Sequence, residues 1–158
     1  MLPRMPRWLV RAPIPLFRTA SQLLGPEFVL LEHRGRTTGR LRYVLLDVVH
    51  REPGALMVIS RYGSTSQWYR NIKADPRVRI WSGGIRHAPA TATQLPADHG
   101  TAILESYRHH HPLAARVLGQ AFGIPELAVG RPIPPRRAEE LPLVRFSVRM
   151  GTARERVN

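Results

Sequence analysis

The apolar residues of this chain fall into short β-branched and aliphatic runs separated by turn signals, and this pattern most restricts the fold. Strands are predicted at residues 27–33, 41–51, 55–60, 78–81, 85–94 and 143–149. The turns Glu52-Pro53-Gly54 and Ser82-Gly83-Gly84 join neighbouring runs directly, so the strands form hairpins rather than β-α-β units. We therefore expect an α+β, mainly β fold: a split β-barrel of about six mostly antiparallel strands with inserted helices.

Helical periodicity appears between these runs. Trp68 and Ile72 share one face of a helix predicted over residues 64–74. Two further helices are predicted over residues 97–111 and 113–122, the first of them capped by Asp98. Residues 123–142 are rich in proline, arginine and glycine and are predicted to form a loop. Pro89 indicates an edge strand or a bulge, because proline has no N–H for a sheet ladder.

A length of 158 residues favours one domain with a substantial core. We expect a basic arm or helix at residues 1–26, a split-barrel domain at 27–150 and a tail at 151–158. The chain has no cysteine, which excludes disulfides and thiolate metal sites. No apolar run reaches the roughly 18 residues of a membrane span, and prolines interrupt the basic N-terminal segment. It does not read as a signal peptide, so a cytoplasmic location is expected.

The formal net charge of +13 implies an anionic partner. Lys73 is the sole lysine among the 24 basic residues, and the arginines are spread along the whole chain. This spread argues against nucleic acid as the partner. Residues 1–18 combine arginines with Trp8 and Phe17, a mixture that suits peripheral contact with a membrane surface. Such a contact and an arm folded over the barrel are both open alternatives.

Two polar segments about twenty residues apart point to a phosphorylated aromatic ligand. The first, residues 33–42, reads HRGRTTGRLR; the second comprises SRYG at 60–63 and QWYRNIKADP at 67–76. Arginine forks, threonine hydroxyls and close-approaching glycines suit a phosphate, and the Trp68-Tyr69 pair suits a flat ring. Taken singly, the Gly-Arg-Thr-Thr-Gly turn also fits a plain hairpin, and Trp68 also fits the buried face of a helix.

Several other kinds of site are excluded. The GRTTG spacing is one residue short of a nucleotide-hydrolase phosphate loop and lacks its lysine, and no G-x-G-x-x-G opens a helix. His109, His110 and His111 are adjacent on a predicted helix and so point in different directions, and no metal site is expected. A G-x-S-x-G nucleophile elbow is also lacking.

In this order, the motifs resemble the nitroreductase-like deazaflavin-dependent oxidoreductases, split β-barrel proteins that use coenzyme F-420. The resemblance covers residues 27–95 well and extends more loosely to the N-terminal segment and to 143–149, and WYxNIxADP is its most specific piece. It implies deazaflavin as the cofactor, with FMN as the second choice. The residues it implies for cofactor binding are Arg36, Thr37, Thr38, Gly39, Arg42, Ser60, Arg61, Gly63, Trp68 and Asn71.

The implied reaction is hydride transfer between the deazaflavin and an electron-poor organic substrate. The candidate catalytic proton donors are Ser60, Tyr62, Tyr69 and Tyr107, with solvent as an alternative donor. Leu41 stands where some members of the family have proline. The loop before Trp68 is also shorter than is usual in the family, which changes the pocket where a substrate would lie. The substrate class of the family therefore cannot be assigned to this chain. A non-catalytic carrier of a flavin, deazaflavin or other anionic ligand is the alternative function. Split barrels often pair through their strand surfaces, so a homodimer and an N-terminal arm that covers this surface instead are both open alternatives.

Overall fold

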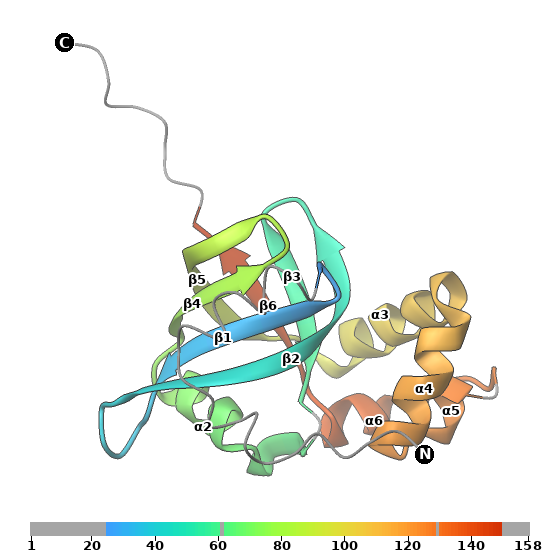
Figure 1. Ribbon diagram of the computed structural model, residues 1–158. Helices are drawn as coiled ribbons and strands as arrows, with labels where there is room; N and C mark the ends of the chain where they lie inside the picture. The colour runs from blue at the N-terminus through green and yellow to red at the C-terminus, as the bar shows by residue number, and fades with distance from the viewer. Residues whose placement is uncertain (1–24, 61, 129, 150–158) are drawn as a thin grey trace.

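The computed structural model describes residues 25–60, 62–128 and 130–149, and its centre is a closed barrel of six antiparallel strands (Figure 1). The strand order around the barrel is β1-β2-β3-β6-β5-β4, and β4 pairs with β1 to close it. The strands are β1 (Phe28–Arg34), β2 (Leu41–Glu52), β3 (Ala55–Ile59), β4 (Arg77–Ser82), β5 (Ile85–Gln94) and β6 (Leu143–Val148). The expected fold class and all six predicted strands are confirmed.

The β1–β2 hairpin determines which side chains meet near its turn. Its register runs from Phe28 opposite Asp47 to Arg34 opposite Leu41, which places His33 directly opposite Arg42. Residues directly opposite each other in an antiparallel pair have neighbouring side chains on the same face. Two residues from separate ends of the HRGRTTGRLR segment are thereby brought together.

The interior of the barrel forms the first hydrophobic core. It includes Val29 and Leu31 of β1, Val58 of β3 and Phe146 of β6, all of them fully buried. The helix α2 (Gln67–Ala74) contributes Trp68, Tyr69 and Ile72 to the same core. Its amphipathic face therefore packs against the barrel interior, below β1 and β2 in Figure 1.

A second core lies between the outside of the barrel and four helices. These helices are α3 (Ala97–His110), α4 (Pro112–Phe122), α5 (Pro125–Ala128) and α6 (Pro135–Glu140), which gather on one side of the barrel (Figure 1). Met57 and Ile59 of β3 face this core, whereas Leu56 and Val58 face the interior. The alternation explains why every residue of β3 is buried.

Three expectations other than the positions of the strands are wrong. Residues 123–142 are not a loop throughout, because Pro125 and Pro135 begin the short helices α5 and α6; proline is favoured at the first helical position. Asp98 does not cap α3 but lies in its first turn, after Pro96 at the cap position. Pro89 is neither on an edge nor at a bulge, because β5 pairs with β4 and β6.

The expected arm at residues 1–26 is described only from Gly25 onward, and the tail at 151–158 lies outside the described residues, so neither part is tested. The proposed membrane-contact segment, residues 1–18, also lies outside them. Within the described part of the chain, no helix has the length and apolar character needed to cross a membrane.

Candidate functional site

The segment between β1 and β2 is a tight turn closed by its own backbone. The N–H of Gly35 donates to the carbonyl of Arg40 at 2.8 Å, and the N–H of Gly39 donates to the carbonyl of Gly35 at 2.8 Å. Gly39 has a φ of +67°, a conformation that side chains disfavour, so glycine is needed there. The closed turn holds Arg36, Thr37 and Thr38 between its two glycines.

Asn71 of α2 fastens this turn to the helix. Its Oδ1 accepts hydrogen bonds from the backbone N–H of Arg36 at 3.1 Å and from Arg36 Nη1 at 2.9 Å. Arg36 Nη1 also donates to Gln67 Oε1 at 3.0 Å. Asn71 is buried, and these bonds satisfy an amide that would otherwise be costly to enclose.

The other end of the Asn71 amide meets a buried histidine. Asn71 Nδ2 lies 3.1 Å from Nδ1 of His33, the inward-facing residue near the end of β1. Burial, and then the neighbouring positive charge of Arg42, lower the pKa of His33 to about 4. The imidazole is therefore neutral near pH 7.

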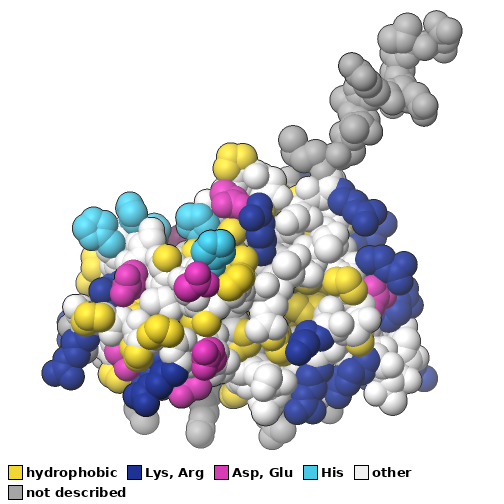
Figure 2. Space-filling view, turned by 180° about the vertical axis from the view of Figure 1, so that it is seen from behind, with side chains coloured by type: hydrophobic (Ala, Val, Ile, Leu, Met, Phe, Trp, Pro, Cys, Tyr) yellow, Lys and Arg dark blue, Asp and Glu magenta, His cyan; other side chains and the backbone are white. Residues whose placement is uncertain are grey.

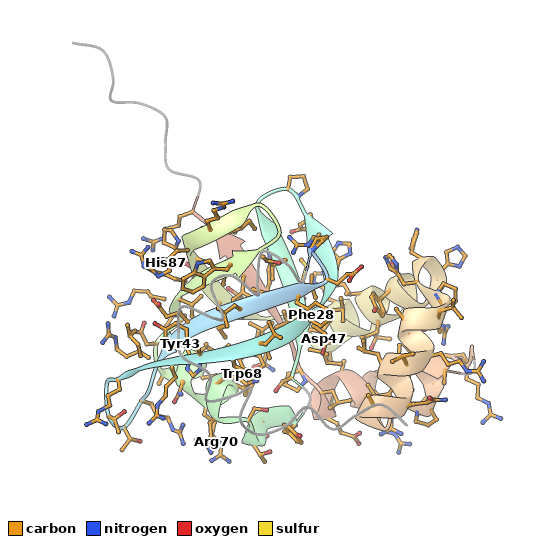
Figure 3. All side chains as sticks on the ribbon, viewed as in Figure 1. Phe28, Tyr43, Asp47, Trp68, Arg70 and His87 are labelled. Carbon is orange, nitrogen blue, oxygen red and sulfur yellow. The ribbon has the colours of Figure 1, made fainter. Side chains whose placement is uncertain are left out.

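Between the hairpin and α2 lies a pocket of about 420 Å³, which is within the usual range for small-molecule sites. Tyr43 on β2 and Trp68 on α2, both labelled in Figure 3, belong to its two walls. None of the described residues that line it is acidic. The lining residues are His33, Gly35, Arg36, Thr37, Thr38, Arg42, Tyr43, Val44, Tyr62, Ser66, Gln67, Trp68 and Asn71.

The pocket brings together most of the residues expected to bind the cofactor. Six of them line it: Arg36, Thr37, Thr38, Arg42, Trp68 and Asn71. Gly39 shapes the turn but does not line the pocket, and Arg61 lies outside the described residues. Within the described residues, neither Arg36 nor Arg42 takes part in an ion pair. Both guanidinium groups therefore remain available to an anionic ligand.

Ser60 and Gly63, two other expected cofactor ligands, hold the connection that leads into α2. Ser60 is fully buried, and its Oγ donates to the carbonyl of Gly63 at 2.8 Å and lies 3.0 Å from Ser66 Oγ. Gly63 has a φ of +57° and begins the short 3-10 helix η2 (Gly63–Thr65). A Cβ at Gly63 would lie 2.5 Å from the carbonyl oxygen of Glu140. Neither residue lines the pocket.

The four expected proton donors are not brought together. Tyr62 lines the pocket and is 69% exposed, whereas Ser60 is enclosed as described above. Tyr69 is in the barrel core, where burial raises its pKa. Tyr107 packs on the second core, and burial, followed by the charges of Asp47 and Glu27, raises its pKa. Of the four, only Tyr62 lines the pocket.

Four polar or aromatic lining residues were not among the expected site residues: His33, Tyr43, Ser66 and Gln67. The signal for His33 was present in the period-two pattern, because Val29, Leu31 and His33 fall on one face of β1. Gln67 and Asn71 are four residues apart on α2 and so lie on one helix face. The signal for Tyr43 is weaker, because Tyr43 pairs with Glu32 and consecutive strand residues point to opposite faces, yet both Tyr43 and Arg42 line the pocket.

Comparison with known proteins identifies the family. Residues 14–117 match the family described as F420H(2)-dependent quinone reductase. The chain belongs to this family. It is accordingly an oxidoreductase that uses coenzyme F-420, and the alternative of a non-catalytic carrier is not retained. No curated protein matches the chain.

Solved structures share the fold. A reductase dependent on reduced coenzyme F-420 is 22% identical with a TM-score of 0.48, and the match covers 77% of this chain and 94% of that chain. An F-420 reductase is 14% identical with a TM-score of 0.51 (82% and 92% covered). A pyridoxamine 5'-phosphate oxidase-related, FMN-binding protein from Nostoc punctiforme is 16% identical with a TM-score of 0.54 (84% and 75% covered). The last two likenesses support the barrel fold.

The lining residues fit coenzyme F-420. The coenzyme carries a phosphodiester and several carboxylates, all of which are negatively charged. Two arginines line the pocket and no acidic residue among those described does, so the pocket wall is suited to these anionic groups. Thr37 and Thr38 add hydroxyl donors beside them. Trp68, with Tyr43 and Tyr62, adds the aromatic surface that a flat ring requires.

Proposed function

We propose that the pocket between the β1–β2 turn and α2 binds coenzyme F-420, with its phosphodiester at Arg36, Thr37, Thr38 and Arg42. The deazaflavin ring lies toward Trp68 and Tyr62. The observation that carries this placement is that two arginines and an aromatic wall line one pocket of about 420 Å³. Within the described residues, neither arginine forms an ion pair with a carboxylate. Asn71 keeps Arg36 in place before the ligand arrives, which reduces the entropy lost on binding.

We propose a quinone as the substrate, on the strength of the family description. When bound, the reduced deazaflavin supplies a hydride from its C5 carbon. A quinone that accepts this hydride needs one proton to become the hydroquinone. Tyr62 is the expected donor that lines the pocket, and solvent is the alternative because Tyr62 is 69% exposed. The other lining residues orient the two reactants and exclude water between them.

The test has two stages on the purified full-length protein. Fluorescence titration with oxidised coenzyme F-420, beside FMN, should give micromolar or tighter binding of the deazaflavin alone. Anaerobic oxidation of the reduced coenzyme should then require a quinone such as a water-soluble naphthoquinone. Equal affinity for both cofactors, or no binding of either, would contradict the cofactor assignment; binding without turnover would contradict the quinone.

We also propose that the protein is cytoplasmic, with residues 1–18 in peripheral contact with the membrane. The arginines and Trp8 of this segment support the contact, as does the lipid solubility of many quinones. The fraction of protein that sediments with anionic vesicles should fall when residues 1–12 are deleted. An unchanged fraction would contradict the membrane contact.

A homodimer paired through strand surfaces is proposed as the assembly, in keeping with the barrel fold. Light scattering across a concentration series measures the mass directly. A monomer mass at all concentrations would contradict the dimer.

A further inference from the structure

We propose that His33 is a ligand-positioning residue, whose Nε2–H donates a neutral hydrogen bond to a carbonyl oxygen in the pocket, and that Asn71 fixes the tautomer that makes this possible. The inference rests on the proposed function, because the ligand carbonyl belongs to the deazaflavin or to the quinone. It adds a residue that was not among the expected cofactor-binding residues, together with a recognition chemistry.

The orientation of the Asn71 amide is the first step. Two N–H groups of Arg36 point at the same amide atom of Asn71, at 3.1 and 2.9 Å. That atom must be the oxygen, because the reversed amide would place NH2 against two donors. The atom that faces His33 is therefore Nδ2, which can only donate.

The tautomer of His33 follows from this orientation. Since Asn71 Nδ2 donates, Nδ1 of His33 must accept and cannot carry a proton. The single proton of the neutral ring is therefore on Nε2. Arg36, Asn71 and His33 form one chain of hydrogen bonds, so the side chain that meets a phosphate also orients the imidazole.

The position of Nε2 is the second observation. His33 lines the pocket although only 5% of its surface is exposed. Within the described residues, Nε2 of His33 has no hydrogen-bond partner. Some fully enclosed side-chain atoms in this protein also have no partner, but Nε2 is not one of them, so part of its surface is accessible. It therefore opens onto the pocket, where a ligand atom can supply the acceptor.

The surrounding charges favour an uncharged acceptor. The charged side chains that line the pocket with His33 are Arg36 and Arg42 from the hairpin, whereas α2 contributes the uncharged Gln67, Trp68 and Asn71. The arginines meet the anionic part of a ligand, and they oppose a third positive charge on His33. A neutral imidazole N–H suits a carbonyl oxygen of the deazaflavin ring or of the quinone.

Nitrogen-15 NMR of the wild-type protein tests the tautomer. His33 should show a bare Nδ1 and a protonated Nε2, without titration between about pH 5 and pH 8. Asn71→Asp should place a carboxylate against Nδ1 and draw a proton onto it, so that His33 titrates in this range. A protonated Nδ1 in the wild type would overturn the inference.

Binding and kinetics then locate the carbonyl oxygen. With oxidised coenzyme F-420 as the probe, His33→Leu should raise the Kd about tenfold if the acceptor is on the deazaflavin, since one hydrogen bond is lost. If the acceptor is on the quinone, the Kd stays unchanged and the KM for the naphthoquinone rises by a similar factor. His33→Gln, which keeps a neutral N–H donor, should recover part of either loss.

A measurement without mutation guards against a misfolded variant. Addition of the coenzyme, or of the naphthoquinone to the loaded protein, should shift the Nε2–H resonance of wild-type His33. No shift with either, or wild-type Kd and KM in folded His33→Leu, would overturn this inference and leave the cofactor assignment intact. Failure of the wild type to bind coenzyme F-420 would instead overturn the proposed function and the carbonyl contact together.

Discussion

At the scale of single residues, Arg36 and Arg42 enter the pocket from opposite ends of one turn. We expect Arg36→Ala and Arg42→Ala each to weaken coenzyme F-420 binding at least about tenfold, because a charge-assisted hydrogen bond contributes roughly 1.5–3 kcal/mol. Fluorescence titration measures the change. The matched control is Arg40→Ala, since Arg40 is exposed on the same turn and does not line the pocket. Equal Kd values for all three variants and the wild type would sink the phosphate assignment.

His33 makes the free energy of unfolding depend on pH. Its pKa is lowered to about 4 in the folded protein, from an ordinary value of 6.5. The unfolded chain therefore binds the extra proton first as the pH falls, so stability is lost between about pH 6.5 and pH 4 and is fully present above that window. The total loss is about 3 kcal/mol.

Urea denaturation at a series of pH values measures this dependence. In His33→Gln the slope between about pH 4 and pH 6.5 should be shallower than in the wild type, because the proton-linked group is removed. Identical slopes in both proteins would show that His33 is not buried in its neutral form.

At the scale of elements, α2 serves both the barrel core and the pocket. Trp68 is 8% exposed, packs in the interior core and lines the pocket, whereas Ile72 is 4% exposed and belongs to the core alone. Trp68→Ala should therefore lower the unfolding free energy by about 3–5 kcal/mol and also weaken cofactor binding. Ile72→Ala should cost about 2–5 kcal/mol with little change in Kd. Chemical denaturation and titration of both variants measure the two effects separately, and an unchanged melting temperature for Trp68→Ala would show that it is not core.

The connection from β3 to α2 depends on close contact with the end of α6. Gly63→Ala should destabilise the protein strongly, because a Cβ would combine a φ of +57° with a contact of 2.5 Å to the Glu140 carbonyl oxygen. Gly54→Ala is the control: Gly54 has a φ of +76°, but nothing lies within 4 Å of its Cβ position. It should cost only the backbone strain, roughly 1–2 kcal/mol. Similar melting temperatures for the two variants would refute a special role for the α6 contact.

At the scale of the whole molecule, the net charge of +13 acts over distance on an anionic cofactor. Figure 2 shows Lys and Arg side chains at several separate places on one face rather than in a single patch. We expect the Kd for coenzyme F-420 to rise about tenfold between 0.1 M and 1 M salt, where the Debye length shrinks from about 10 Å to about 3 Å. The KM for an uncharged quinone is the internal control and should change far less. A salt-independent Kd would mean that the charge plays no part in recognition.

The elements of this fold were largely readable in the sequence because hydrophobic period and turn residues act locally. The strands at 41–51 and 85–94, and the helix near Trp68, come from such local signals, and the structure confirms them. The short helices α5 and α6 were missed because proline and arginine suppress the helical pattern, although Pro125 and Pro135 suit a first helical position.

What the sequence by itself determined is the set of chemical groups: the arginines and threonines of one turn, the aromatic start of α2, and the strand pattern of a barrel. Only the tertiary structure decided which of them meet. Ser60, Tyr69 and Tyr107 carry suitable hydroxyls, but their side chains are used in buried contacts away from the pocket. His33 lies in the pocket because of the β1–β2 register and its hydrogen bond with Asn71. The physical reason is that residue type is local, while burial and hydrogen-bond partners depend on contacts between segments distant in the chain.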